Sequence, residues 1–429
     1  MAAEEQVVWR ADSNNIYERF IEQLDEAMSG EKELTEGDQD TRYAMKLQQE
    51  RLQEKGTKIR YHITPRGFMS NGQNLPRKWM DKHYVSEVAY YTSMWERDIA
   101  VGNGRPFRQK SKMTIYETKT DVIGGVNVED EIYVCPGCGA PSKIKDLLGG
   151  CQYCGSRFQM SELYPKITSH YLVKDFSFAG NEMKYYLMKF MIGTGIVILI
   201  AMLAGMASRG ELSPLRIGSL IGTILLSAVF GVVMGYFLAS ITLLFKLFFE
   251  AGKTVPMMGA IGAGKRFEAF MKRYSPEFSY EYLTGKTVAL LKMIMFAKDP
   301  QELPFYVGAP LGDRFHDLVD VIFRGAMGYK GMKEKDGYLH VTVDVFLENA
   351  YVTNGRVRVG VNEKLRVTLV KNLNVPIQYN FSIKKLECPT CHASFDATKN
   401  KTCPYCGSTY RIEDADWAVE SVSGPWGRG

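Results

Sequence analysis

The stretch Phe190-Met-Ile-Gly-Thr-Gly-Ile-Val-Ile-Leu-Ile-Ala-Met-Leu-Ala-Gly-Met-Ala-Ser208 contains no charged residue. As a helix, its 19 residues would cover nearly all of the roughly 30 Å hydrocarbon core of a bilayer. A second uncharged run, residues 217–245, follows after a short charged loop. Two such runs in succession predict a transmembrane helical hairpin over residues 183–250, the longer run being tilted or extended past the interface.

The cations beside these runs predict the orientation of the hairpin. Cytoplasmic flanks of membrane spans are enriched in lysine and arginine. We therefore expect a protein of the inner (cytoplasmic) membrane, with both termini in the cytoplasm. Seven cations lie in the flanks and two in the loop: Lys174, Lys184, Lys189, Lys246, Lys253, Lys265 and Arg266, against Arg209 and Arg216.

Small residues recur at helical spacing in the second run, as Gly218-x-x-x-Gly222 and Gly231-x-x-x-Gly235. Such pairs allow helices to approach closely. They fit either packing within the hairpin or a homo-oligomer. Neither run carries Asp, Glu, Arg or His, which argues against a transport path.

The flanks have the composition of folded protein, with 24% charged and 12% aromatic residues in the 429-residue chain. The net charge of +5 is small and mixed in sign, so it does not indicate a nucleic-acid-binding face. We expect two cytoplasmic domains, residues 1–182 and 251–429, on either side of the hairpin.

All eight cysteines fall in four C-x-x-C pairs, with 12 and 11 residues between the pairs of each set. Two such turns supply four thiolates to one tetrahedral ion. The pattern predicts two structural Zn²⁺ ions in closed zinc ribbons, over residues 131–160 and 386–412. The ligands would be Cys135, Cys138, Cys151 and Cys154 in the first ribbon, and Cys388, Cys391, Cys403 and Cys406 in the second.

Other interpretations of the cysteines stay open at this point. They include disulfides, which a cytoplasmic domain disfavours, a redox-active pair, and iron in a rubredoxin-like site. His392 follows Cys391 and is an alternative ligand. Closed sites stabilise a fold and offer no open position for catalysis.

The two ribbons form an internal repeat. Residues 151–158 (CQYCGSRF) match residues 403–410 (CPYCGSTY) closely, and strand-like runs precede and follow each ribbon. Either the two flanks arose by duplication, or one common ribbon was used twice.

In the first flank, apolar spacing predicts a helix from residue 16 that ends at Gly30. A second helix, over residues 41–55, is polar and expected to pack weakly. Residues 84–95 are expected to form a third helix, and residues 112–118 and 132–134 to form strands.

In the second flank, Ser275-Pro276-Glu277 predicts a helix start, and the helix would reach about residue 297. Strands are expected over residues 338–348 and 356–370, joined at Asn354-Gly355 and bent at residues 362–364. Residues 381–386 and 416–422 would flank the second ribbon as further strands. The fold class is thus α+β, with a helix-packed curved antiparallel sheet and an apolar groove at its open end, unless its own side chains fill that groove.

Residues 265–422 resemble the Tim-forty-four-like domain family, through the helical lead-in, the strand from Leu339 to Leu347, the Asn354-Gly355 turn, Lys364-Leu-Arg-Val-Thr-Leu-Val370 and the Trp417 strand. The resemblance implies a cone-like α+β fold similar to nuclear transport factor two. It also implies association with membranes, the holding of other proteins there, and no catalytic residues. Bacterial members with membrane helices and zinc ribbons look most similar, whereas the mitochondrial members lack both.

Two further patterns have simpler interpretations. Residues 259–266 approach a phosphate-binding loop, but Arg266 replaces the required Ser or Thr, so a flexible linker is expected. Asp317 and Asp320, near His316, are expected on a solvated helical face.

These observations favour a non-enzymatic membrane-anchored scaffold or adaptor. Its partner would be a protein or a second copy, with anionic lipid as a further candidate for the basic residues after the hairpin. The alternative is a membrane-tethered zinc-ribbon protein that binds nucleic acid, although no basic stripe with aromatic residues supports it. An enzyme with an unrecognised site is the third class.

Overall fold

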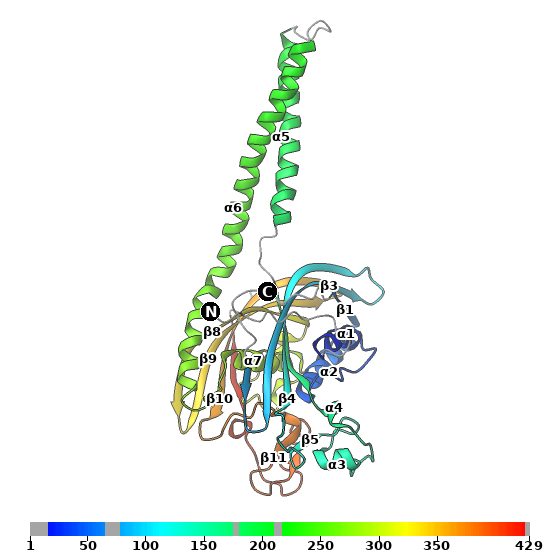
Figure 1. The fold of residues 1–429 in the computed structure, drawn as a ribbon, viewed down its shortest axis with the longest axis vertical. Helices are drawn as coiled ribbons and strands as arrows, with labels where there is room; N and C mark the ends of the chain where they lie inside the picture. Colours follow the sequence, from blue (N-terminus) through cyan, green and yellow to red (C-terminus); the bar gives the residue numbers. More distant parts are fainter. Residues whose placement is uncertain (1–15, 65–77, 175–179, 210–216, 425–429) are drawn as a thin grey trace. The chain divides into compact units, whose positions relative to one another are not determined.

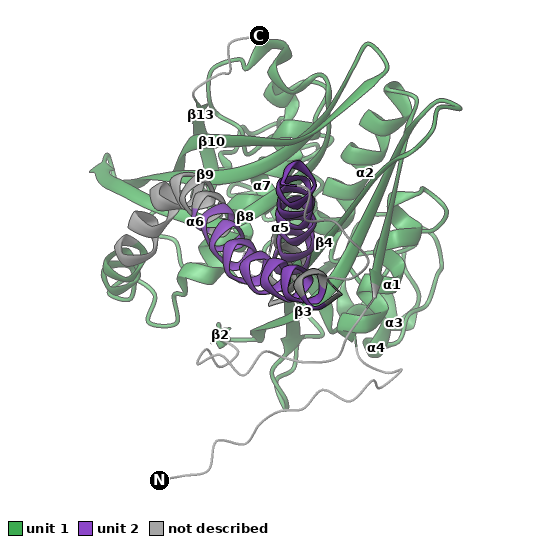
Figure 2. Ribbon diagram, turned by 90° about the horizontal axis from the view of Figure 1, so that it is seen from above, with its two compact units in different colours: residues 1–175, 259–429 green, residues 176–258 purple. Residues whose placement is uncertain are grey.

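The computed structural model describes residues 16–64, 78–174, 180–209 and 217–424. The chain divides into two compact units, coloured separately in Figure 2. The sheet unit combines residues 1–175 with residues 259–429, and the hairpin unit comprises residues 176–258. We expected the two flanks to form separate domains, whereas their contacts place them in one compact unit.

One mixed sheet runs through the whole sheet unit (Figure 1). The strand order is β1-β3-β4-β7-β8-β9-β10-β13, and β2 (Lys78–Met80) pairs with β3. All neighbours are antiparallel except β7 and β8, which pair in parallel at Val173 and Phe323. The strands are β1 (Thr57–Thr64), β3 (Tyr84–Val101), β4 (Phe107–Val122), β7 (Lys166–Lys174), β8 (Leu318–Lys335), β9 (Tyr338–Thr353), β10 (Arg356–Asn372) and β13 (Ala418–Ser423).

The two halves of this sheet have the same layout. In the first half (residues 16–174), helix α2 (Gln39–Glu54) precedes three antiparallel strands, a ribbon and a fourth strand. In the second half (residues 259–424), helix α7 (Tyr280–Phe296) precedes the same series. The repeat therefore extends from the ribbons to the helix and strand order of each half, which favours duplication over reuse of a ribbon alone.

The helices pack on the sheet in two separate cores. The apolar residues of α7, among them Leu283, Leu290 and Ile294, share one core with Val343 of β9 and Val367 of β10. Helix α1 (Ile16–Met28) forms a second core with strands of both halves, and α2 packs against α7. The predicted packing of α7 on the inward strand faces is present.

Short elements complete the ribbons and connections. They are β5 (Ile132–Val134), β6 (Pro141–Lys143), α3 (Ile144–Gly149), α4 (Met160–Leu163), η2 (Pro300–Glu302), η3 (Gly312–Phe315), η4 (Ile383–Lys385), β11 (Leu386–Glu387), β12 (Ser394–Phe395) and η5 (Ile412–Asp414).

Several predicted elements differ from the structure. The helix expected over residues 84–95 is strand β3, where the aromatic and β-branched side chains alternate in burial along much of the strand. Helix α7 begins at Tyr280, because the Ser279 hydroxyl caps it by accepting the Glu281 N–H, and the Pro276 segment forms a turn before it. The strand expected over residues 381–386 is mostly the 3₁₀ helix η4.

The hairpin between β9 and β10 has the expected tight turn, with positive φ at Asn354 (51°) and Gly355 (74°). The irregularity in β10 lies earlier than expected. The register shifts between Arg358 and Val361, where Gly360 has φ 71°, whereas residues 362–364 pair regularly.

The hairpin unit contains two apolar helices that are long enough to cross a membrane. They are α5 (Gly180–Ser208) and the first part of α6 (Ile217–Met271). Gly231 lies against Gly195, and Gly235 against Met191. The Thr194 hydroxyl also donates to the Gly231 carbonyl across the pair, at 2.9 Å. This glycine pair therefore packs the hairpin together, while Gly218 and Gly222 have open space around them.

Helix α6 is continuous for 55 residues. Residues 259–266, expected to form a flexible linker, belong to this helix. That prediction was wrong, because three glycines within eight residues do not end this helix.

Candidate metal centres and the interface between the halves

Each C-x-x-C turn is held by the same pair of backbone hydrogen bonds. In the first turn, the Cys135 N–H donates to the Ala140 carbonyl and the Gly139 N–H to the Cys135 carbonyl, both at 2.9 Å. The same two bonds recur around Cys151, Cys388 and Cys403, at 2.8 to 3.0 Å. These bonds give all four turns the same backbone conformation.

The residue after the second cysteine of each turn adopts a left-handed conformation. Three of these residues are Gly139, Gly155 and Gly407, with φ of 75°, 72° and 73°. The fourth is His392, with φ 59°. Its imidazole contacts Glu387, with Nδ1 2.9 Å from the carboxylate, so the histidine meets a carboxylate instead of joining the sulfur cluster.

The eight sulfur atoms form two clusters of four. Within each cluster all sulfurs lie within 4.8 Å of one another. The sulfur atoms of Cys135 and Cys154 lie 3.7 Å apart, and those of Cys391 and Cys403 lie 3.6 Å apart. A tetrahedral ion with Zn–S bonds of about 2.3 Å requires S–S edges of about 3.8 Å, and a disulfide would bring two sulfurs to about 2.05 Å. All eight cysteines are free thiols, so the geometry fits a tetrahedral ion in each cluster.

Both ribbons are anchored in the sheet unit by their first cysteines. Cys135, Cys151, Cys388 and Cys403 are buried, whereas the second cysteine of each pair is exposed. The first ribbon has a small core of its own that includes Ile144 and Leu147. The second ribbon joins the main core through Phe395 and Ile412.

The two ribbons lie side by side, although about 250 residues separate them in the sequence. Strand β6 of the first contacts β12 of the second, and β5 contacts η4. Tyr153 and Tyr405, which occupy the same position in their C-x-x-C turns, interact with each other. Their side chains remain 65% and 62% exposed, so the ribbons together present two aromatic side chains to solvent.

A buried ion pair joins the two halves. Arg97 of β3 donates to Asp320 of β8 at 2.5 Å, and both side chains are almost fully buried. Asp320 also accepts from the Tyr61 hydroxyl at 2.6 Å and from Gln48 of α2 at 3.2 Å. The expectation of a solvated Asp320 on a helix was wrong, because residues 318–335 form a central strand.

Helix α2 is not the weakly packed helix that its polar sequence predicts. Arg51 is 4% exposed and donates to the carbonyls of Ala297 and His316, both at 3.0 Å. A cation at the carboxy-terminal end of α7 also complements the helix dipole. The polar residues of α2 are thus partners for the second half, which a helical-periodicity argument does not detect.

A third polar contact joins the halves near the ribbons. Ser382 donates to Asp40 of α2 at 2.6 Å, and Lys286 of α7 pairs with Asp416 at 2.5 Å. Burial lowers the pKa of Lys286, but Asp416 and Asp40 outweigh this effect and the net shift is upward. The lysine therefore stays charged between the two carboxylates.

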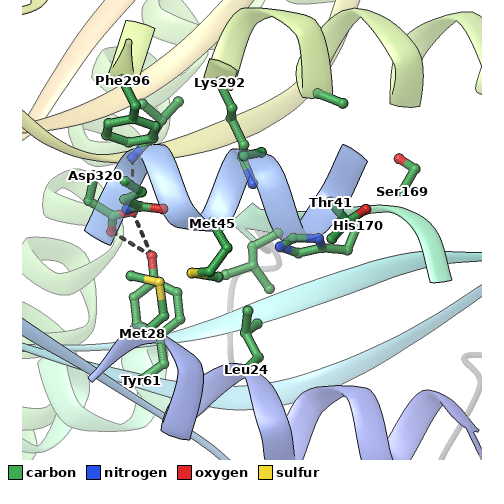
Figure 3. A pocket seen from close by; sticks show the side chains of 15 residues that line it. Leu24, Met28, Thr41, Met45, Tyr61, Ser169, His170, Lys292, Phe296 and Asp320 are labelled. Carbon is green, nitrogen blue, oxygen red and sulfur yellow. Dashed lines mark hydrogen bonds between the residues drawn. The ribbon is translucent and has the colours of Figure 1, made fainter. Parts of the chain in front are cut away.

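A small cavity of about 40 Å³ lies between α1, α2 and α7. Figure 3 shows His170 and Lys292 on its wall, with Tyr61 pointing to Asp320. Burial lowers the pKa of both His170 and Lys292. This volume holds about three water molecules, so the cavity is too small for an organic substrate.

A comparison of the chain with models of known protein families, with curated proteins and with solved structures gives no match in any of the three.

Proposed function

We propose that this protein is a non-enzymatic scaffold or adaptor, anchored in the inner (cytoplasmic) membrane by its helical hairpin. The sheet unit would lie in the cytoplasm together with both termini and would recruit a protein partner. One Zn²⁺ in each Cys₄ cluster would fix the ribbons.

The pairing of the two ribbons is the main support for this function. Two metal-stiffened turns place Tyr153 and Tyr405 next to each other and exposed. Rigid, exposed tyrosines often contribute a large part of the binding energy at protein interfaces. The buried charged groups support a non-enzymatic function, because they pair with one another. Arg97 pairs with Asp320 between the halves, and Lys286 pairs with Asp416 within the second half.

The family resemblance remains part of the proposal. The second half has a helix packed on antiparallel strands, as the Tim-forty-four-like family would require. It shares its sheet with the first half through β7 and β8, so the family's cone would here be one half of a larger sheet.

A photo-crosslinking amino acid at Tyr405, in native membranes, tests this function. We expect one discrete protein adduct, which disappears when Cys388→Ser disrupts the ribbon. The matched control places the same amino acid at the exposed Lys333 on β8, and this position should give no such adduct.

Adducts with nucleic acid at Tyr405 would instead favour the membrane-tethered nucleic-acid-binding alternative, since exposed aromatics also stack on bases. The absence of any adduct at Tyr405 would count against both functions.

A further inference from the structure

A pocket of about 160 Å³ opens at the end of the second half of the sheet. Its floor is a row of three side chains from adjacent strands. Leu339 of β9 pairs with Lys371 of β10, and Trp417 comes directly before Ala418, which pairs with Val370. Because directly paired residues share a face, all three side chains lie on the same face of the sheet. Leu339 and Trp417 belong to the main core, so this face is the one turned toward that core.

The walls of the pocket are mostly apolar. They are formed by Met271 at the end of α6 and by the loop after β10, with Leu373, Val375 and Ile377. For comparison, an apolar cavity of about 150 Å³ accommodates a benzene ring. The pocket thus offers space for an apolar body of about that size.

Two buried donors line this pocket: one has no acceptor, and the other has only a distant one. Trp417 is 1% exposed, and its indole N–H has no hydrogen-bond partner. Lys371 is 3% exposed and donates only to the Ala415 carbonyl, at 3.4 Å. A buried donor without an acceptor costs about 1–3 kcal/mol, and more for a charged group.

Two other polar residues of the wall, Asn372 and Tyr274, already have partners. The Asn372 amide donates to Asp414 at 2.9 Å and accepts the Asn374 N–H at 2.9 Å. The Tyr274 hydroxyl donates to Glu334 at 3.2 Å. The described residues that line the pocket include no Asp or Glu, and no carboxylate among the described residues forms an ion pair with Lys371.

We propose that this pocket binds a small monocarboxylate with an apolar body about the size of a benzene ring. The carboxylate would accept from the Lys371 ammonium and the Trp417 N–H, and the apolar body would lie against Met271 and Ile377. Burial lowers the pKa of Lys371, although Asp416 opposes the shift. A bound carboxylate would favour the charged lysine. The proposal does not depend on the scaffold function.

Benzoate is the probe, and benzamide is its neutral analogue of equal shape. The zinc-loaded full chain in detergent is titrated by saturation-transfer NMR. We expect benzoate to bind at least tenfold more tightly than benzamide. Lys371→Met should weaken benzoate binding at least tenfold, and Trp417→Phe about threefold or more. The exposed Lys333→Met is the control and should change nothing.

A second variant tests the pocket independently of whether Lys371→Met folds. Val375→Trp fills the pocket from its half-buried rim and should abolish binding while Lys371 is retained. Equal binding of benzoate and benzamide, full affinity in Lys371→Met or Val375→Trp, or no benzoate binding would overturn the proposal. The tripeptide Gly-Gly-Phe distinguishes a chain terminus from a free acid. If it binds tenfold more tightly than benzoate, the free-acid assignment is wrong.

Discussion

At the scale of single residues, Arg97 and Asp320 show how the two halves depend on each other. The charges are paired in the interior, and each lies on a strand of a different half. A buried charge that loses its partner is strongly destabilising, by about 3–5 kcal/mol. Each half therefore supplies the opposite charge that the buried charge of the other half needs.

Replacing Arg97 by methionine should lower the free energy of unfolding by about 3–5 kcal/mol, because Asp320 loses its charged partner. Urea denaturation of the zinc-loaded protein in detergent measures the loss. The control is Arg108→Met, whose side chain is 66% exposed and pairs with Asp98. It should cost far less, because an exposed ion pair contributes little to stability. Equal losses for the two variants would contradict the assigned role of Arg97.

Asp38 predicts a specific pH dependence. Burial and the neighbouring Asp40 raise the pKa of this side chain to about 7, above the value of about 3.9 in an unfolded chain. Between these values the folded state binds more protons than the unfolded state. This group therefore makes stability fall as the pH rises from about 4 to about 7.

The Asp38→Asn variant removes this titration and keeps the cap of α2, since asparagine caps helices as well as aspartate. We expect the variant to lose less stability than the parent between pH 5.5 and 7, and to be the more stable protein at pH 8. Urea midpoints across this range provide the measurement, with the exposed Asp313→Asn as control. Parallel pH profiles of Asp38→Asn and the parent would show that Asp38 does not titrate in this way.

At the scale of elements, the sequence predicted those whose pattern is local. Helix α1, the Asn354-Gly355 hairpin and the four C-x-x-C turns follow from short-range spacing. Helix α2 and strand β8 were misjudged, because their polar residues are buried by contacts more than 200 residues away in the sequence. Such pairing cannot be inferred from a single sequence.

Each ribbon is predicted to hold one Zn²⁺, since its sulfur separations fit a tetrahedral ion. Metal analysis of the purified protein should give two zinc ions per chain. Cys388→Ser should reduce this to one and destabilise the sheet, because the second ribbon lies between β10 and β13 and its folding free energy comes largely from the metal. Finding iron, or no metal, would refute the assignment.

The apolar hairpin offers a matched pair of glycine substitutions. A Cβ at Gly235 would lie 2.5 Å from the Met191 backbone, whereas a Cβ at Gly222 would meet nothing within 4 Å. Gly235→Ala should therefore weaken the contact between α5 and α6 by about 1–3 kcal/mol, and Gly222→Ala should not. SDS-induced unfolding in mixed micelles measures the difference. Reduced crosslinking between chains in Gly222→Ala would instead point to a role for Gly222 in a homo-oligomer.

At the scale of the whole molecule, one sheet is built from two chain segments that the apolar hairpin separates in sequence. A hairpin between two domains would allow each flank to fold alone. The structure instead joins α2 to the end of α7 through Arg51, and joins β7 to β8. Folding of the sheet must therefore wait until both flanks are present.

Because the two halves depend on each other, we expect that the second half does not fold alone. A fragment of residues 259–429 lacks β7 and α2, so Asp320 loses Arg97, Tyr61 and Gln48 together. Expressed alone, it should aggregate or melt without cooperativity. Co-expressed with residues 1–175 as a separate chain, it should co-purify in a one-to-one complex with a cooperative thermal transition, because a covalent connection through the hairpin is not needed for the contacts. The control complex carries Arg97→Met in the first fragment and should dissociate at a lower temperature. A cooperative transition of the isolated 259–429 fragment, equal to that of the complex, would mean that the two halves are independent domains after all.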